Sequence, residues 1–294
     1  MRLRTLLLSL GLAAAPASGW ALDETHVYGI ANFDGAGECT NGSTHARHTT
    51  TAANFASPFL LYQAFGLWDE TSTRNNLDAR GSYFTDASKA ASCACTADDL
   101  NTDDGIDDAD VMFVHTHGGH SSTASPPYTN LAMGNSTYDC SVRTSDNFRL
   151  GQSGGDLDIA VVKACQSGDY EVWQGGGYRP QITDSTSSLS VWNAFHGNSS
   201  CSSATETNVT SYAWGSLSDG VGENWIDIFY VDEAAADDDD CPTSIVMGSS
   251  NSVRMDMYNN GGFWDRKDTG TKSGSTIVYI GGCDPGAGIV LPNG

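Results

Sequence analysis

The sequence is poor in positive charge. Its 294 residues include 14 Lys and Arg against 36 Asp and Glu, which gives a formal net charge of −22. A surface of this kind repels phosphate groups, so we expect neither nucleic acid nor an anionic membrane as a partner. The same field favours cations and basic peptides, although net charge on its own says more about solubility than about the chemistry of a site.

Long hydrophobic runs are also scarce, apart from one at the N-terminus. Arg2 and Arg4 precede the run LLLSLGLAAA, and small residues follow it. This pattern predicts a secretory signal peptide over residues 1–21, cleaved near Ala21. No later stretch approaches the roughly 20 apolar residues that a membrane span requires, and no cysteine that could carry a lipid ends the apolar run. We therefore expect a secreted or periplasmic protein.

Internal repeats and linker-like segments are absent as well, so residues 22–294 are predicted to form a single α/β domain. Hydrophobic runs predict strands at 26–33, 111–114, 158–164, 190–195, 243–248 and 275–282. Residues 57–68 predict a helix with Ser57 as its cap and Pro58 in its first turn. Residues 222–233 predict another, with Trp225, Ile228 and Phe229 on one face.

Two of these strands end at reactive side chains. The run VMFV is followed by HTHGGH, which ends at His120, and the run IAVVKA is followed by Cys165. Both runs are continuously apolar, as is typical of strands buried on both faces of a parallel sheet. Because catalytic groups collect beyond the carboxyl ends of parallel strands, we expect His117 and Cys165 to lie close together.

The two strand ends resemble those of a known group of enzymes. His117-Gly118 closes one strand and Ala164-Cys165 closes the next, 48 residues later. This pattern is similar to that of the caspase-like cysteine peptidases, which include caspases, metacaspases, legumain, gingipains and clostripain. The resemblance implies a three-layer αβα sandwich with a mostly parallel sheet, and an oxyanion hole formed by the N–H groups of Gly118 and Cys165. The blocks HTHGG, KACQSG and AFHGNS also resemble a family of secreted bacterial proteins, a similarity that implies no activity.

The chemistry predicted for this site is acyl transfer. A thiol with its ordinary pKa of about 8.5 is only slightly ionised at neutral pH, so a nucleophilic Cys165 needs a nearby imidazole, and His117 is the candidate. We therefore predict a secreted cysteine endopeptidase that hydrolyses peptide bonds in peptide or protein substrates and requires no cofactor. Gly119, His120, Gln166 and His196 are candidate pocket residues, and His196 could equally be a structural histidine.

Two alternatives remain open. His115, His117 and His120 resemble the H-x-H-x-D-H zinc motif of the metallo-β-lactamase superfamily, except that Gly119 stands where the motif has Asp. Three histidines and a water would make a catalytic zinc site, and the protein would then be a zinc-dependent hydrolase. The other alternative is a catalytically inactive exported binding protein with the same fold, because a fold alone does not prove an activity.

The eight cysteines of an exported chain point first to disulfides. An even count allows four closed bridges that include Cys165, which would rule out the peptidase. If Cys165 is free, at least one other cysteine must also stay unpaired. Cys93 and Cys95 are too close in sequence to pair comfortably with each other.

An acidic run precedes the histidine strand. Asp103, Asp107 and Asp110 are candidate calcium ligands, although residues 99–110 do not match the spacing of an EF-hand loop. The alternative is a solvated loop, which is also the expectation for the second acidic run, 237–240.

Overall fold

The structure is a computed structural model that describes residues 23–33, 44–85, 105–135, 140–145, 148, 150–151, 155–174, 187–230 and 240–293. The predicted signal peptide lies outside these residues, as does Asp103. None of the described helices combines the length and the hydrophobicity needed to cross a membrane.

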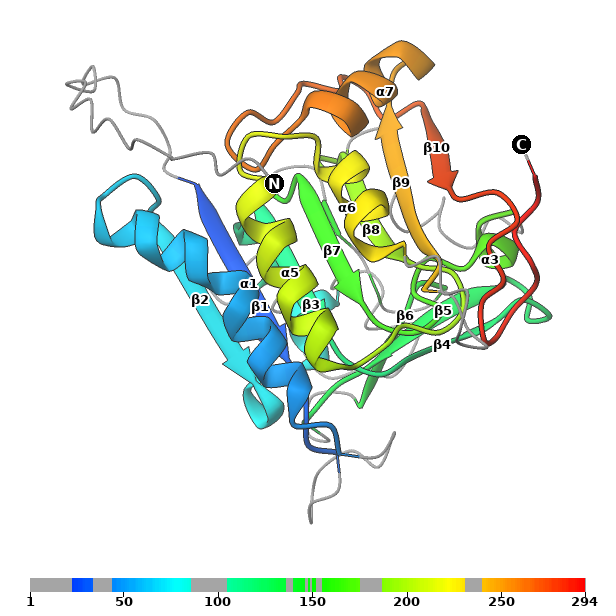
Figure 1. Cartoon of the computed structure of the whole chain (residues 1–294), viewed down its shortest axis with the longest axis horizontal. Helices are drawn as coiled ribbons and strands as arrows, with labels where there is room; N and C mark the ends of the chain where they lie inside the picture. Colours follow the sequence, from blue (N-terminus) through cyan, green and yellow to red (C-terminus); the bar gives the residue numbers. More distant parts are fainter. Residues whose placement is uncertain are drawn as a thin grey trace, which may run out of the picture.

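A seven-stranded sheet forms the centre of the molecule (Figure 1), with the strand order β10-β9-β8-β7-β3-β1-β2. Strands β2, β1, β3, β7 and β8 are mutually parallel, whereas β9 runs antiparallel to both of its neighbours. The strands are β1 (Glu24–Gly29), β2 (Glu70–Asn75), β3 (Val111–His115), β7 (Ile159–Lys163), β8 (Val191–Phe195), β9 (Pro242–Gly248) and β10 (Gly274–Tyr279).

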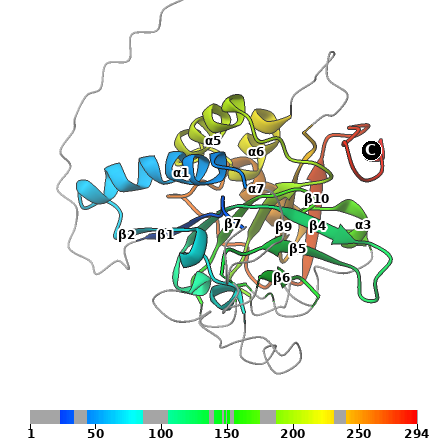
Figure 2. The ribbon, with the colours of Figure 1, turned by 90° about the horizontal axis from the view of Figure 1, so that it is seen from below.

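Helices cover one face of this sheet, and a small antiparallel sheet lies on the other side (Figure 2). The helices are α1 (Arg47–Ala64), α5 (Ser203–Gly215), α6 (Val221–Phe229) and α7 (Asn251–Asn260), and a short helix α3 (Tyr170–Gln174) follows β7. The small sheet has the order β4-β5-β6, with β4 (Gly118–Ser121), β5 (Tyr128–Ala132) and β6 (Ser141–Arg143). The predicted α/β class with a mostly parallel sheet packed by helices is confirmed, and a small antiparallel sheet accompanies it.

The central strands β3, β7, β8 and β9 are buried along their whole length, which explains their largely apolar sequences. In β3, Val111 and Phe113 pack into the core beneath the helices, while Met112 and Val114 pack into the core on the opposite face. Alternate residues of a strand point to opposite faces, so a strand between two cores must be apolar throughout.

Helix α1 begins ten residues before the predicted start, so the prediction of Ser57 as its cap is wrong. Pro58 lies inside the helix and has no N–H to donate to the carbonyl of Asn54. The Ser57 hydroxyl donates to that carbonyl instead, at 2.8 Å. The carbonyl of Asn54 thus keeps a hydrogen-bond donor, and the helix continues through the proline.

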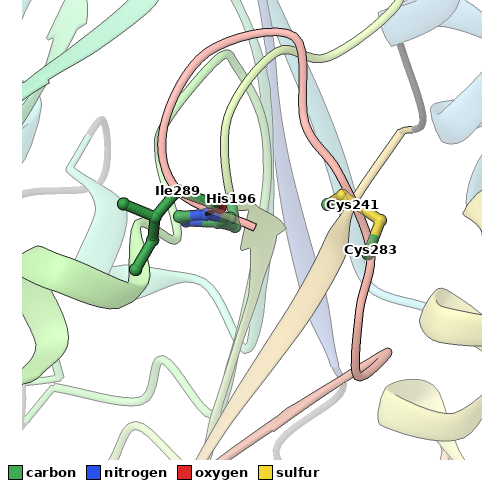
Figure 3. Close-up of a disulfide and its surroundings, with 4 residues drawn as sticks. All are labelled: His196, Cys241, Cys283 and Ile289. Carbon is green, nitrogen blue, oxygen red and sulfur yellow. Dashed lines mark hydrogen bonds between the residues drawn. A yellow bond between two sulfur atoms is a disulfide. The ribbon is translucent and has the colours of Figure 1, made fainter. Parts of the chain in front are cut away.

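The C-terminal segment is fixed against the end of the sheet by two contacts (Figure 3). A disulfide joins Cys241, directly before β9, to Cys283. The ring of His196, at the end of β8, has its Nε2 atom 2.7 Å from the carbonyl oxygen of Ile289. Because that distance requires a proton on Nε2, His196 donates to the C-terminal segment.

Arg266 links three segments at the amino ends of the parallel strands. Its guanidinium contacts Asp23 at 2.5 Å, Asp110 at 2.8 Å and Asp158 at 2.9 Å. Burial raises the pKa of Asp110 to about 6 and also raises that of Asp158, even though Arg266 opposes both shifts. The arginine therefore holds together carboxylates that would otherwise repel one another.

We expect Arg266→Ala to lower the free energy of unfolding by about 2–3 kcal/mol, because it leaves three partly buried carboxylates without their cation. When the pKa of a carboxyl is higher in the folded state than in the unfolded state, the folded protein becomes less stable as the pH rises from the unfolded-state pKa towards the folded-state pKa. The deficit should therefore be larger at pH 8 than at pH 5 in urea titrations. Lys267→Ala, which removes an exposed ion pair with Asp265, is the matched control and should cost less than about 1 kcal/mol. Equal losses for the two variants would contradict this role.

Candidate functional site

The two predicted catalytic residues follow strands that are neighbours in the sheet, β3 and β7. His115, the last residue of β3, pairs with Lys163, the last residue of β7, so partners differ by 48 residues. The same difference separates His117 from Cys165. Both residues lie just beyond the ends of these strands, at the carboxyl edge of the sheet, where the N–H of Thr116 still donates to the carbonyl of Lys163 at 3.3 Å.

The backbone at Gly118 lies against Ala164 and Cys165, just beyond the ends of β3 and β7. A Cβ atom added to Gly118 would lie 2.1 Å from the carbonyl oxygen of Cys165 and 3.0 Å from the Cβ of Ala164. No larger residue fits there without movement of the backbone, so position 118 requires glycine. The His-Gly and Ala-Cys pairs predicted from the sequence are thus in direct contact.

A cavity of about 130 Å³ lies at this edge and is lined by both His117 and Cys165. A cavity of about 150 Å³ is known to accommodate one benzene-sized group, so this space holds a single reacting group and not an entire peptide. The full lining consists of His45, His48, His115, Thr116, His117, Lys163, Ala164, Cys165, Ser199 and Cys201.

Cys165 is a free, half-buried thiol with a hydrogen-bond donor aimed at its sulfur. The backbone N–H of Ser199 lies 3.4 Å from the Sγ atom of Cys165. The next residue, Gln166, has a φ of +57°, in the left-handed region that residues other than glycine rarely adopt. A strained turn directly after a nucleophile is a recurrent way of exposing its side chain.

Lys163 adds a fully buried amine to the same wall of the cavity. Its Nζ atom donates to the Ser199 hydroxyl at 2.9 Å and to the Ser200 carbonyl. Burial lowers the pKa of Lys163 to about 8, while the carboxylate of Asp240 opposes this shift. The lysine holds the loop that carries Ser199, and through it the donor to Cys165.

His117 is enclosed by other rings. The centroid of its ring lies 5.0 Å from that of Phe33, 5.0 Å from that of His45 and 5.3 Å from that of His48. These contacts restrict the rotamers of the ring, so the imidazole is held in place at the cavity wall. Thiol activation requires an imidazole that can reach the sulfur, and His117 lines the same cavity as the free thiol of Cys165.

The other predicted pocket residues lie outside the lining of this cavity. His120, on β4, has its Nδ1 atom 3.8 Å from the buried carboxylate of Asp169, and the Nδ1 of His196 lies 3.4 Å from the same carboxylate. His196 also accepts the backbone N–H of Tyr170 at 3.1 Å, which together with its contact to Ile289 gives it a structural role. Gly119 lies near Gln166, 3.9 Å from its Oε1 atom as measured from an added Cβ.

The alternative zinc ligands do not come together. Three groups of ligand atoms within 4.8 Å of one another occur among the described residues, and none of them combines His115, His117 and His120. His115 lies with His48 and Cys201, whereas His120 lies with Asp169 and Glu171. His115 and His117 both line the cavity, whereas His120 lies outside it beside Asp169, so the three histidines of HTHGGH do not converge on one point.

Of the candidate calcium ligands, Asp103 lies outside the described residues. Asp107 accepts the backbone N–H of Gly151 at 2.6 Å, and Asp110 accepts that of Glu24 at 2.8 Å and pairs with Arg266. Both carboxylates are thus bound by protein donors. Calcium binding in this region stays a prediction.

The structure adds cavity residues that the sequence did not suggest: His45, His48, Lys163, Ser199 and Cys201. His45 lies just before α1 and His48 lies in its first turn. Their spacing of three residues could have indicated a pair of histidines at a helix start, and the position of Cys201 after the end of β8 could have indicated a cysteine near the same sheet edge. Cys201 is also the other free thiol of the described residues, as the parity of the cysteines requires if Cys165 is free.

Comparisons with known proteins leave the family open. No protein-family model and no curated protein matches the chain. Among solved structures, the chain is similar to protein GSU0716 from Geobacter sulfurreducens, with a TM-score of 0.45 and 9% sequence identity. The match covers 85% of this chain and 99% of that chain. A likeness at this level assigns neither a family nor an activity.

Proposed function

We propose that the protein is an exported cysteine endopeptidase of the caspase-like type, with Cys165 as its nucleophile and His117 as its general base. The observation that supports the proposal is that His117 and a free Cys165, which follow the adjacent parallel strands β3 and β7, line the same cavity. The resemblance of His117-Gly118 and Ala164-Cys165 to that group of enzymes supports it independently.

The proposed reaction has two stages. The imidazole of His117 takes the thiol proton, and the sulfur of Cys165 attacks the carbonyl carbon of the scissile peptide bond. Collapse of the tetrahedral intermediate breaks the carbon–nitrogen bond, and the imidazolium returns the proton to the leaving amine. Water then hydrolyses the thioester and regenerates the thiol.

Two features of the site favour the charged states of this reaction. The N–H of Ser199 points to the sulfur, where it would stabilise a thiolate. The resemblance assigns the oxyanion to the N–H groups of Gly118 and Cys165, which belong to backbone segments in direct contact. Both sets of donors are part of the backbone, so they need no rearrangement when charge develops.

Hydrolysis of a fluorogenic peptide library by the mature protein tests the proposal. We expect cleavage of internal peptide bonds that is lost after treatment with iodoacetamide and retained in the presence of a metal chelator. Activity that survives alkylation but not chelation would contradict the proposal and favour a metal-dependent hydrolase. The absence of any cleavage would favour the inactive binding protein.

A further inference from the structure

Three residues that the proposed reaction does not use lie together in the cavity. His48 belongs to the first turn of α1, His115 ends β3, and Cys201 lies in the loop between β8 and α5. One ligand atom of each lies within 4.8 Å of the ligand atoms of the other two. We propose that His48, His115 and Cys201 form a binding site for a divalent transition metal of the zinc type.

The ring of His48 is oriented as in known metal sites. Its Nδ1 atom lies 2.6 Å from the carbonyl oxygen of Ile30, so a neutral ring carries its proton there. The lone pair is then on Nε2. Histidines that bind metals almost always donate their other N–H to a carbonyl or carboxylate, because this fixes both the tautomer and the direction of the ring.

His115 presents an unsatisfied nitrogen. Its side chain is 2% exposed, and its Nδ1 atom has no hydrogen-bond partner. Buried polar atoms are nearly always paired, so one without a partner in a cluster of ligands calls for an explanation. The centroid of its ring lies 4.1 Å from that of His48, which places the two imidazoles side by side.

Neither imidazole is charged at neutral pH. Burial lowers the pKa of His48 to about 4 and lowers that of His115 well below its ordinary value. Metal ligands must be unprotonated, so these two rings need not lose a proton when an ion binds. Lys163 lines the same cavity, and its positive charge repels a bound metal ion. We therefore expect the affinity for the metal to be lower than in a site without a neighbouring amine.

Cys201, the third ligand, determines which metal the site prefers. Cys201 is a free, half-buried thiol, and burial raises its pKa, so without a metal it is held mainly as the neutral thiol. A bound zinc ion deprotonates such a thiol. Two imidazoles and a thiolate favour zinc over calcium or magnesium, which prefer oxygen ligands. Three protein ligands leave one position of a tetrahedral ion for water or another group.

Competition with a chromogenic chelator tests the site. The samples are mature protein freed of metal, with Cys165 and Cys201 verified as reduced by peptide mapping. We expect the wild type to bind one zinc ion per chain, and Cys201→Ser and His48→Ala each to weaken binding at least about tenfold. With cobalt in place of zinc, the wild type should show a sulfur-to-metal charge-transfer band that Cys201→Ser lacks.

The controls are Cys165→Ser and His120→Ala, which should bind zinc as tightly as the wild type. Thermal melts of the metal-free variants identify any that fail to fold, and Cys201→Ser, at a half-buried position, is the decisive variant. Zinc binding unchanged in folded Cys201→Ser, loss of binding in Cys165→Ser, or no binding by the wild type would each overturn the assignment. None of these results depends on peptidase activity.

Discussion

Cys165→Ser is expected to lower peptide hydrolysis at least about 10³-fold, because loss of a nucleophile leaves only the contributions of binding and of the oxyanion donors. A serine hydroxyl is a far weaker nucleophile than a thiol beside an imidazole. Rates with a fluorogenic peptide identified in the library measure the loss. Cys165→Ala should lose activity to a similar degree.

The structure offers a control for handling and folding. Ser203→Ala changes an exposed residue at the start of α5 and should keep the rate of the wild type. Melting temperatures of all variants should remain close together, since Cys165 is only half-buried. Retention of more than about a tenth of the activity in folded Cys165→Ser would remove this residue from the reaction.

His117→Ala is expected to reduce turnover of the same peptide by at least about 10²-fold, the usual contribution of positioned acid–base catalysis. His120→Ala is the matched control, because it removes a histidine three residues away that lies beside Asp169 and outside the cavity. It should leave turnover within a few-fold of the wild type. A loss at His120 equal to that at His117 would contradict the assignment of the base.

Much of the central sheet could be predicted from the sequence, because its inner strands β3, β7, β8 and β9 are buried on both faces. The runs VMFV and IAVVK are apolar throughout, and the structure places them as adjacent parallel strands β3 and β7. Paired residues of these two strands differ by 48 positions, as do His117 and Cys165, which follow them. The predicted position of both residues beyond the carboxyl ends of two strands agrees with this pairing.

Elements without such a signal were missed or misplaced. β2 has the polar sequence ETSTRN and lies at the edge of the sheet, where one side needs no strand partner. In α6 the buried face includes Ile226 together with Trp225 and Phe229, whereas Ile228 is only half-buried, so the predicted face was partly wrong. Short helices contact the core at angles that periodicity alone does not fix.

The residues of the candidate site also fall into those that the sequence predicted and those that it did not. Residues at the ends of adjacent strands, His117 and Cys165, could be placed from their own sequence context. The cavity also contains His48 from α1 and Cys201 from the loop after β8, which come together only when the helix packs on the sheet. Contacts between distant segments depend on tertiary packing, and a single sequence carries no local pattern for them.

Peptide mapping after brief alkylation tests whether Cys165 is a nucleophile activated by His117. The mature protein is treated with a limiting amount of iodoacetamide, and the labelled cysteines are identified by mass spectrometry. Cys201 is the internal reference, because it is a free thiol in the same cavity. We predict labelling chiefly at Cys165, and a marked slowing of this labelling in His117→Ala. Equal labelling of the two thiols, or Cys165 found quantitatively in a disulfide of the protein isolated from its native source, would contradict the proposed role of Cys165.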